Sequence, residues 1–290
     1  MGVDHPRGVL VLGMHRSGTS VATRLVQMLG LSASTDQIGP TTWNPRGLWE
    51  SRSLIRVNDR LLVESGQAWW YPPPDEPRYS EAMFGLHRFD VPARDSFDAV
   101  HPKSRWAWKD PRTSLLIPFW RRVLNQVAGL VVFRHPVDVA RSLEKRNAMA
   151  LPFALALWER YNRLILRHGR GMPVLLLRYD DLLDDGERSV ARIHAFLLES
   201  GLSHPQEHHG SVIADSPADR SLRHSHARAE GLSVDPAFAS TLQLYAQLES
   251  GLPSSSHIDT VELPPEGDWV SEVLSQRGPQ DPPPWRDPPA

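Results

Sequence analysis

The sequence predicts an α/β fold, a three-layer sandwich in which helices cover both faces of a central parallel sheet. Short apolar runs alternate with segments of helical periodicity, and this alternation is typical of parallel sheets built from strand–helix–strand units. Two of the runs end in polar loops that lead directly into a helix, an arrangement that places ligand sites at the carboxyl edge of such sheets. The predicted strands are 9–12, 105–108, 129–133 and 174–178.

Helical periodicity fills most of the intervals between these strands. In the first interval Val21, Leu25 and Leu29 recur every four residues, and Gly30 is a suitable stop. Pro136 suits the first turn of a later helix, because that position needs no N–H donor. The predicted helices are 19–29, 113–125, 137–147, 153–168 and 187–200.

The first predicted strand is followed by Gly13-Met14-His15-Arg16-Ser17-Gly18-Thr19-Ser20. This loop matches the phosphate-loop pattern G-x-x-x-x-G-K-[ST] at every defined position except one, where Thr19 replaces the lysine. Glycines let successive N–H groups converge on an anion, and the following helix directs its positive end to the same point. Arg16 is the only cation in the loop, and Thr19 and Ser20 add hydroxyl donors. The alternative is an ordinary strand–turn–helix unit with a glycine turn.

A second strand–loop–helix unit carries Arg134 and Ser142. Arg134 comes at the end of the third predicted strand, where ligand contacts are usual in an open parallel sheet. Ser142 follows eight residues later, about two turns into the next helix. The two side chains are therefore placed to reach one phosphate from opposite sides. Taken singly, each is more typical of a solvated surface.

With these two motifs in this order, the chain resembles the sulfotransferases that use 3′-phosphoadenosine 5′-phosphosulfate (PAPS). The resemblance covers roughly Val9 to Leu183 and implies a P-loop NTPase-like sulfotransferase fold. It implies that Arg134 and Ser142 hold the 3′-phosphate, and that Arg223, in a late basic segment, serves the same phosphate. This late segment lacks the Arg-Lys-Gly motif of the cytosolic animal enzymes. The 5′-phosphosulfate would lie in a cradle made by Gly13, His15, Arg16, Ser17, Gly18, Thr19 and Ser20.

Two further segments resemble elements of bacterial sulfotransferases. The first, Lys109-Asp110-Pro111-Arg112, implies that Lys109 stabilises charge on the transferring sulfonate. The second, Asn44 to Glu50, supplies a carboxylate downstream of the phosphate loop, and we expect Glu50 to take the proton of the acceptor hydroxyl. The other candidates for this base are His15, Asp110 and His135. A turn closed by a salt bridge is the structural alternative for Asp110 and Arg112.

These residues together predict a PAPS-dependent enzyme that moves a sulfuryl group to a hydroxyl by in-line transfer. The acceptor class stays open among a carbohydrate, a lipid-linked sugar and a natural product, and the scheme requires no metal. A P-loop kinase or nucleotide hydrolase is one alternative, but it predicts a lysine at position 19. The other alternative is a non-catalytic nucleotide-binding protein.

The composition of the chain limits which other classes of protein and which locations are expected. The chain has 290 residues, a formal net charge of −2 and a pI near 6.7, which gives no general case for nucleic-acid binding. It has no cysteine, and its first residues resemble neither a signal peptide nor a membrane span, so we expect a cytoplasmic enzyme. The histidines at 204, 208 and 209 have no well-spaced carboxylate or cysteine partner and do not predict a metal site.

We expect one sulfotransferase domain over 1–262. Within it, 66–104 is a predicted acceptor-side cap, in which Trp69 or Trp70 would stack on the acceptor; the alternative is a cap that packs its own aromatic residues. The last residues, 263–290, are rich in proline and predict an extended tail. One short helix is expected in that tail, around Val270, Val273 and Leu274.

Overall fold

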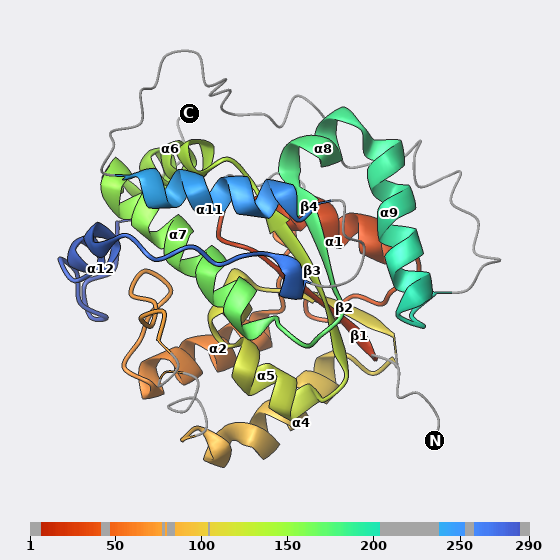
Figure 1. The fold of residues 1–290 in the computed structure, drawn as a ribbon. Coiled ribbons are helices and arrows are strands. Elements are labelled where there is room, and N and C mark those ends of the chain that lie inside the picture. The colour runs from red at the N-terminus through yellow and green to blue at the C-terminus, as the bar shows by residue number, and fades with distance from the viewer. Residues whose placement is uncertain are drawn as a thin grey trace.

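The computed structural model describes residues 7–41, 47–76, 79, 85–103, 105–203, 238–252 and 258–284. Its centre is a sheet of four parallel strands in the order β2-β1-β3-β4 (Figure 1). The strands are β1 (Gly8–Leu12), β2 (Trp106–Lys109), β3 (Val127–Phe133) and β4 (Val174–Arg178). The predicted α/β class is confirmed, and each strand begins and ends within two residues of its predicted bounds.

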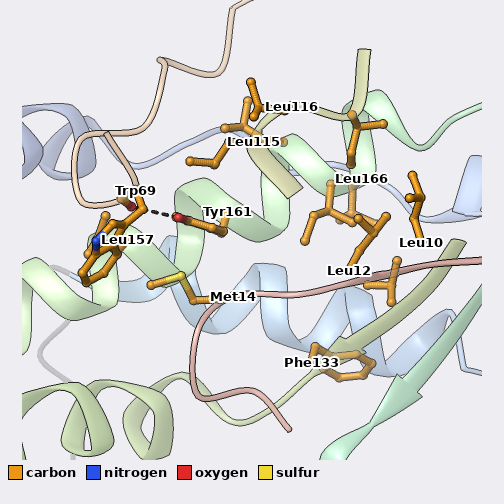
Figure 2. Packing of buried hydrophobic residues seen from close by; sticks show 14 of the residues in the cluster. Leu10, Leu12, Met14, Trp69, Leu115, Leu116, Phe133, Leu157, Tyr161 and Leu166 are labelled. Carbon is orange, nitrogen blue, oxygen red and sulfur yellow. Dashed lines mark hydrogen bonds between the residues drawn. The ribbon is translucent and has the colours of Figure 1, made fainter. Parts of the chain in front are cut away.

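Side chains of the sheet alternate between its two faces, as the pleat of a strand requires. Val9 and Val11 of β1 pack in a core beneath α1 (Thr19–Met28), α8 (Tyr179–Asp184) and α9 (Gly186–Glu199). Leu10 and Leu12 face the opposite way, into a larger core, part of which Figure 2 shows. The second face is covered by α2 (Arg52–Glu64), α4 (Asp90–Val100), α5 (Ile117–Leu124), α6 (Pro136–Asn147), α7 (Leu151–His168), α11 (Ala239–Ser250) and α12 (Asp268–Leu274).

The helix predicted over 113–125 is wrong in its first part. The chain there forms a 3₁₀ turn, η2 (Pro111–Leu115), and α5 starts only at Ile117. Pro118 explains the break, because proline has no N–H to continue a helix and is favoured in the first turn of a new one. Two other 3₁₀ turns, η1 (His87–Phe89) and η5 (Ile258–Thr260), connect longer elements.

The predicted cap over 66–104 contains regular structure that the sequence analysis does not anticipate. Helix α4 packs against α2 and α5, and Phe97 is buried in edge-to-face contact with Trp106 and Trp108. This half of the segment therefore packs on the core of the domain, with Phe97 against two indoles of β2. The role of an acceptor-side cap stays a prediction. The half that contains Trp69 lies beside the site described below.

Two segments far apart in sequence are attached to α7 by its arginines. Arg163 donates to the Asp75 carboxylate at 2.8 Å, and Arg167 donates to its other oxygen. Arg160 donates to the Glu266 carboxylate at 2.6 Å and to the backbone oxygen of Pro73 at 2.9 Å. The residues after Trp70 and those before α12 are thus held on the same helix.

The short helix expected near the C-terminus is present as α12. Val270 and Leu274 are buried in the larger core, so residues 268–274 share the core of the domain. The described residues after α12, up to position 284, contain no further helix or strand. A domain boundary at 262 stays a prediction. None of the described helices is both long and apolar enough to cross a membrane.

Candidate active site

The loop between β1 and α1 has a backbone that only glycine accommodates at two positions. Gly13 and Gly18 have φ angles of 151° and 94°. A Cβ at Gly13 would lie 2.4 Å from the carbonyl oxygen of Val132, and a Cβ at Gly18 would lie 2.0 Å from the Tyr179 ring. Arg16 also has a positive φ, 70°, which is unusual for a residue with a side chain. The loop is therefore curled tightly at the carboxyl end of the central strand.

The first turn of α1 is available to an anion. Its cap residue, Gly18, supplies no side-chain acceptor, and the first turn contains no acidic residue. The N–H groups of a first helical turn have no acceptor inside the helix, and the helix dipole adds positive potential there. Inside the loop, the buried hydroxyl of Ser17 has no hydrogen-bond partner among the described residues. This donor set fits a bound phosphate or sulfate ester.

The two predicted phosphate motifs meet in one place. The Nε atom of Arg16, in the loop, donates to Oγ of Ser142 on α6 at 2.8 Å. Arg134 is buried, its guanidinium lies 4.7 Å from the centre of the Tyr179 ring, and its Nε lies 3.7 Å from a carboxylate oxygen of Asp138. Burial, together with the charge of Arg134, lowers the pKa of Arg16. A contact between side chains 126 positions apart thus joins the two motifs into a single cationic surface.

Glu50 and Lys109 form a buried ion pair beside this surface. Nζ of Lys109 lies 2.6 Å from Oε1 of Glu50, and only 2% of the lysine side chain is exposed. Lys109 ends β2 and is in register with Val11, two residues before the loop. Glu50 precedes the N-cap Ser51 of α2 and accepts a backbone hydrogen bond from Ile38 at 2.7 Å. Both partners are therefore held by the backbone, and the pair leaves Oε2 of Glu50 without a hydrogen bond among the described residues.

Asp110 is held by several donors at once. It accepts from the backbone N–H and a guanidinium nitrogen of Arg112, at 3.0 and 3.1 Å, and from Nδ2 of Asn58 at 2.9 Å. The Asn58 oxygen accepts in turn from the indole of Trp120 at 2.8 Å. A fully buried carboxylate with its lone pairs occupied in this way orients its neighbours and is a poor candidate for the base.

His15 is buried in a positively charged environment. Its ring centre lies 4.6 Å from that of Trp69, and its Nε2 has no hydrogen-bond partner among the described residues. Burial, followed by the charges of Arg146, Arg112, Lys109 and Arg16, lowers the pKa of His15 well below its ordinary value. His15 is therefore neutral at physiological pH and resists protonation, which weakens its case as the proton acceptor. Burial likewise lowers the pKa of His135.

Arg146 is a site residue that the sequence analysis misses. Its guanidinium is buried 5.9 Å from the Trp69 ring, and its Nε donates to Oδ1 of Asn147 at 2.5 Å. Burial and the charge of Arg16 lower its pKa to about 9, so Arg146 carries a charge that an anion would stabilise. The available signal was spacing: Arg146 follows Ser142 by four residues, which puts both on one helix face.

The structure thus brings together the loop, Ser142, Arg134, Lys109 and Glu50. Ser20 contacts the backbone oxygen of Leu48 through its hydroxyl at 3.4 Å, and Thr19 is buried in the first turn of α1. The prediction for Arg223 lies outside the described residues. Within the described ranges no cluster of histidine and carboxylate side chains is arranged to hold a metal ion. The cations of the site are Arg16, Lys109, Arg112, Arg134 and Arg146, and the nearby carboxylates are Glu50, Asp59, Asp110 and Asp138.

A P-loop-like loop and a second strand–helix unit, joined by the Arg16–Ser142 contact, define a cationic site at the carboxyl edge of an α/β fold. Comparison with protein families gives the class: residues 6–202 match the model of the Sulfotransferase family, and the chain belongs to that family. It is therefore a sulfotransferase, as the sequence analysis expects.

Solved structures similar to this chain include two sulfotransferase domains. One is from the Synechococcus PCC 7002 olefin synthase, at 16% identity over 95% of this chain and 96% of that chain, with a TM-score of 0.44. The other is from the curacin biosynthetic pathway, at 17% identity over 94% and 98%, with a TM-score of 0.41. No curated protein matches the chain.

Proposed function

We propose that the sulfuryl donor is PAPS and that the site holds both of its phosphate-bearing ends. The observation that carries the proposal is the Arg16–Ser142 contact, which joins the loop to the unit that contains Arg134. A ligand with two separated anionic groups needs two cationic subsites held at a fixed distance from each other. The Arg16–Ser142 contact fixes the position of one subsite relative to the other. The curled loop, the uncapped start of α1 and the unpartnered Ser17 hydroxyl fit the 5′-phosphosulfate. Arg134 and Ser142 would hold the 3′-phosphate.

When bound, PAPS supplies a sulfuryl group on a phosphate leaving group. Glu50 accepts the proton of the acceptor hydroxyl through Oε2, because Oε1 is held by Lys109. Lys109, Arg16 and the N–H groups of the loop stabilise the negative charge that develops on the sulfonate and the leaving phosphate. Arg146 adds positive potential from the next turn beyond Ser142. These residues are fixed before the ligand arrives, so little reorganisation opposes the transfer step.

The acceptor is a hydroxyl compound, in the class of a carbohydrate, a lipid-linked sugar or a natural product. The kinase alternative is disfavoured because Thr19 replaces the phosphate-loop lysine and is buried within the first turn of α1. The non-catalytic alternative leaves the buried Glu50–Lys109 pair without a purpose. A buried pair costs desolvation free energy, and a hydrophobic pair of similar volume would often be equally stable.

Competitive binding tests this class assignment directly. We expect adenosine 3′,5′-bisphosphate to raise the melting temperature more than adenosine 5′-phosphate does, without Mg²⁺. ATP with Mg²⁺ is expected to compete weakly. Ser142→Ala should reduce the stabilisation by the bisphosphate, whereas Arg141→Ala, one position earlier on α6, should not. A preference for ATP with Mg²⁺ would overturn the proposal and return the chain to the kinase class.

A further inference from the structure

A cavity of about 440 Å³ lies beside the proposed transfer site. Its walls include Trp70 and Gln67 from the segment after α2, Asp59 from α2 itself, and Arg112. Pro279 and Pro282, from the residues that follow α12, close another side. The cavity therefore brings together parts of the chain more than 200 positions apart.

The cavity shares two walls with the transfer site. Trp69 lines the cavity and also packs against His15 and lies near Arg146. Figure 2 shows the Tyr161 hydroxyl reaching the backbone oxygen of Trp69, a hydrogen bond of 2.8 Å that fixes this wall. Arg112 lines the cavity, and its charge acts on both Glu50 and His15. The Trp69 ring therefore separates a molecule in this cavity from His15 of the phosphate loop.

Residues 277–284, here called the C-terminal strap, are held across this region. The indole N–H of Trp70 donates to the backbone oxygen of Gly278 at 3.2 Å, and Nδ2 of Asn147 on α6 donates to that of Pro284 at 3.3 Å. The Arg277 guanidinium lies 5.6 Å from the Phe153 ring centre on α7. The strap is rich in proline, which limits its backbone freedom. The strap lies outside residues 6–202, which match the family model, so this wall of the cavity is not part of the matched region.

The chemistry of the walls favours a neutral ligand. Nε of Arg112 lies 2.6 Å from Oδ1 of Asp59, and the same guanidinium contacts Asp110 at 3.1 Å, so this cation of the lining is already paired with two carboxylates. An anionic acceptor would have to compete with Asp59 for the guanidinium. Most of the remaining lining is apolar, with two indoles and two prolines, and such surfaces pack against C–H groups.

The lining also contains a carboxylate that can accept a hydrogen bond from a ligand hydroxyl. Half of the Asp59 side chain is exposed, and Oδ1 is the oxygen that lies 2.6 Å from Nε of Arg112. A purely aliphatic ligand offers no donor to this carboxylate. A sugar ring offers both C–H faces for the indoles and hydroxyl donors for Asp59. We propose that this cavity is the acceptor site and that it takes a neutral glycosyl group; the inference rests on the proposed PAPS-dependent activity.

The test is a panel of acceptors with radiolabelled PAPS: methyl glucoside, methyl galactoside, phenyl glucuronide, phenol and octanol. We expect label on the neutral glycosides. Trp70→Ala should raise their KM about tenfold, the effect of losing one stacked aromatic contact. Asp59→Asn should also raise that KM, whereas Asp98→Asn should not, although Asp98 is exposed to a similar degree and paired with an arginine. Neither Trp70→Ala nor Asp59→Asn should change the dissociation constant of adenosine 3′,5′-bisphosphate.

A binding readout separates this inference from the activity on which it rests. With adenosine 3′,5′-bisphosphate bound, saturation-transfer NMR should detect methyl glucoside on the unmodified chain and lose the signal in Trp70→Ala. Normal bisphosphate binding with label only on phenol or octanol would overturn the glycosyl assignment while leaving the donor assignment in place. The glycosyl assignment also fails if glycosides bind equally well to Trp70→Ala. Loss of 3′-phosphate-dependent nucleotide binding would instead refute the proposed function itself.

Discussion

The Glu50–Lys109 ion pair gives the most discriminating prediction. Glu50→Gln keeps the shape of the side chain but removes its charge, so Lys109, 2% exposed, loses its partner at 2.6 Å. Breaking a buried pair from one side costs about 3–5 kcal/mol, because the remaining charge is left uncompensated. For a chain of 290 residues, with an unfolding entropy of about 2.1 cal/mol/K per residue, we expect the melting temperature to fall by roughly 5–8 °C. Loss of the base should lower kcat by about 10²–10⁴-fold.

The double variant Glu50→Gln with Lys109→Met separates the two roles of the pair. It removes the uncompensated charge, so most of the lost melting temperature should return, because an apolar replacement of a buried pair is often neutral. Turnover should not return. Calorimetric melting and PAPS turnover are measured on the same preparations. Near-normal kcat in Glu50→Gln would refute the base assignment, and an unchanged melting temperature would refute the buried pair.

Three further outcomes follow from the site and its supports. Arg146→Met removes a buried charge that a bound anion stabilises. It should therefore raise the melting temperature of the free protein and weaken the binding of adenosine 3′,5′-bisphosphate about tenfold or more. In calorimetry, an unchanged affinity, or an equal loss of affinity in the exposed control Lys145→Met, would count against this role. Gly18→Ala should distort the loop and abolish bisphosphate binding, because the new Cβ would lie 2.0 Å from the Tyr179 ring. Gly39→Ala, whose Cβ would meet nothing within 4 Å, should bind the bisphosphate normally. Normal bisphosphate binding by Gly18→Ala would contradict the loop geometry. Burial tends to raise the pKa of Asp75, but the hydrogen bonds and charges of Arg163 and Arg167 outweigh burial and lower that pKa. The ionised Asp75 carboxylate therefore contributes stability above the unfolded pKa of about 3.9, and this stability is lost as the pH falls through the lower folded pKa. The melting temperature should therefore decline below about pH 4, and Asp75→Asn should melt lower at neutral pH with a shallower acid decline; parallel curves for the two proteins would exclude this carboxylate.

The sheet was predictable because its strands are continuous apolar runs buried on both faces. Two of the helices that were not predicted, α2 and α4, are rich in charged residues. In α2 the signals were present, since Ser51 caps the helix and Leu54, Leu61 and Leu62 share its buried side, but charged residues between them obscured the period. In α4 the charged residues on the exposed side had the same effect. Such helices are stabilised mostly by the surfaces they cover, and a single sequence does not display those surfaces.

The site was predictable where a motif fixes local geometry and unpredictable where tertiary contacts do. The loop and the Arg134–Ser142 spacing follow from strand–helix units. Arg146 stands in a Lys-Arg-Asn run at a helix end, a pattern typical of solvated surfaces, and only the packing of Trp69 over it shows its burial. The Glu50–Lys109 contact spans 59 positions, so no local spacing encodes it.

The central claim is that Arg134 binds the 3′-phosphate of the donor, and one calorimetric cycle tests it. Adenosine 3′,5′-bisphosphate and adenosine 5′-phosphate are titrated into the unmodified chain and into Arg134→Ala. Removal of the 3′-phosphate should weaken binding roughly 10- to 100-fold in the unmodified chain, the strength of charge-assisted hydrogen bonds, and by much less in the variant. An equal loss in both proteins would show that the 3′-phosphate does not contact Arg134, and would contradict the account.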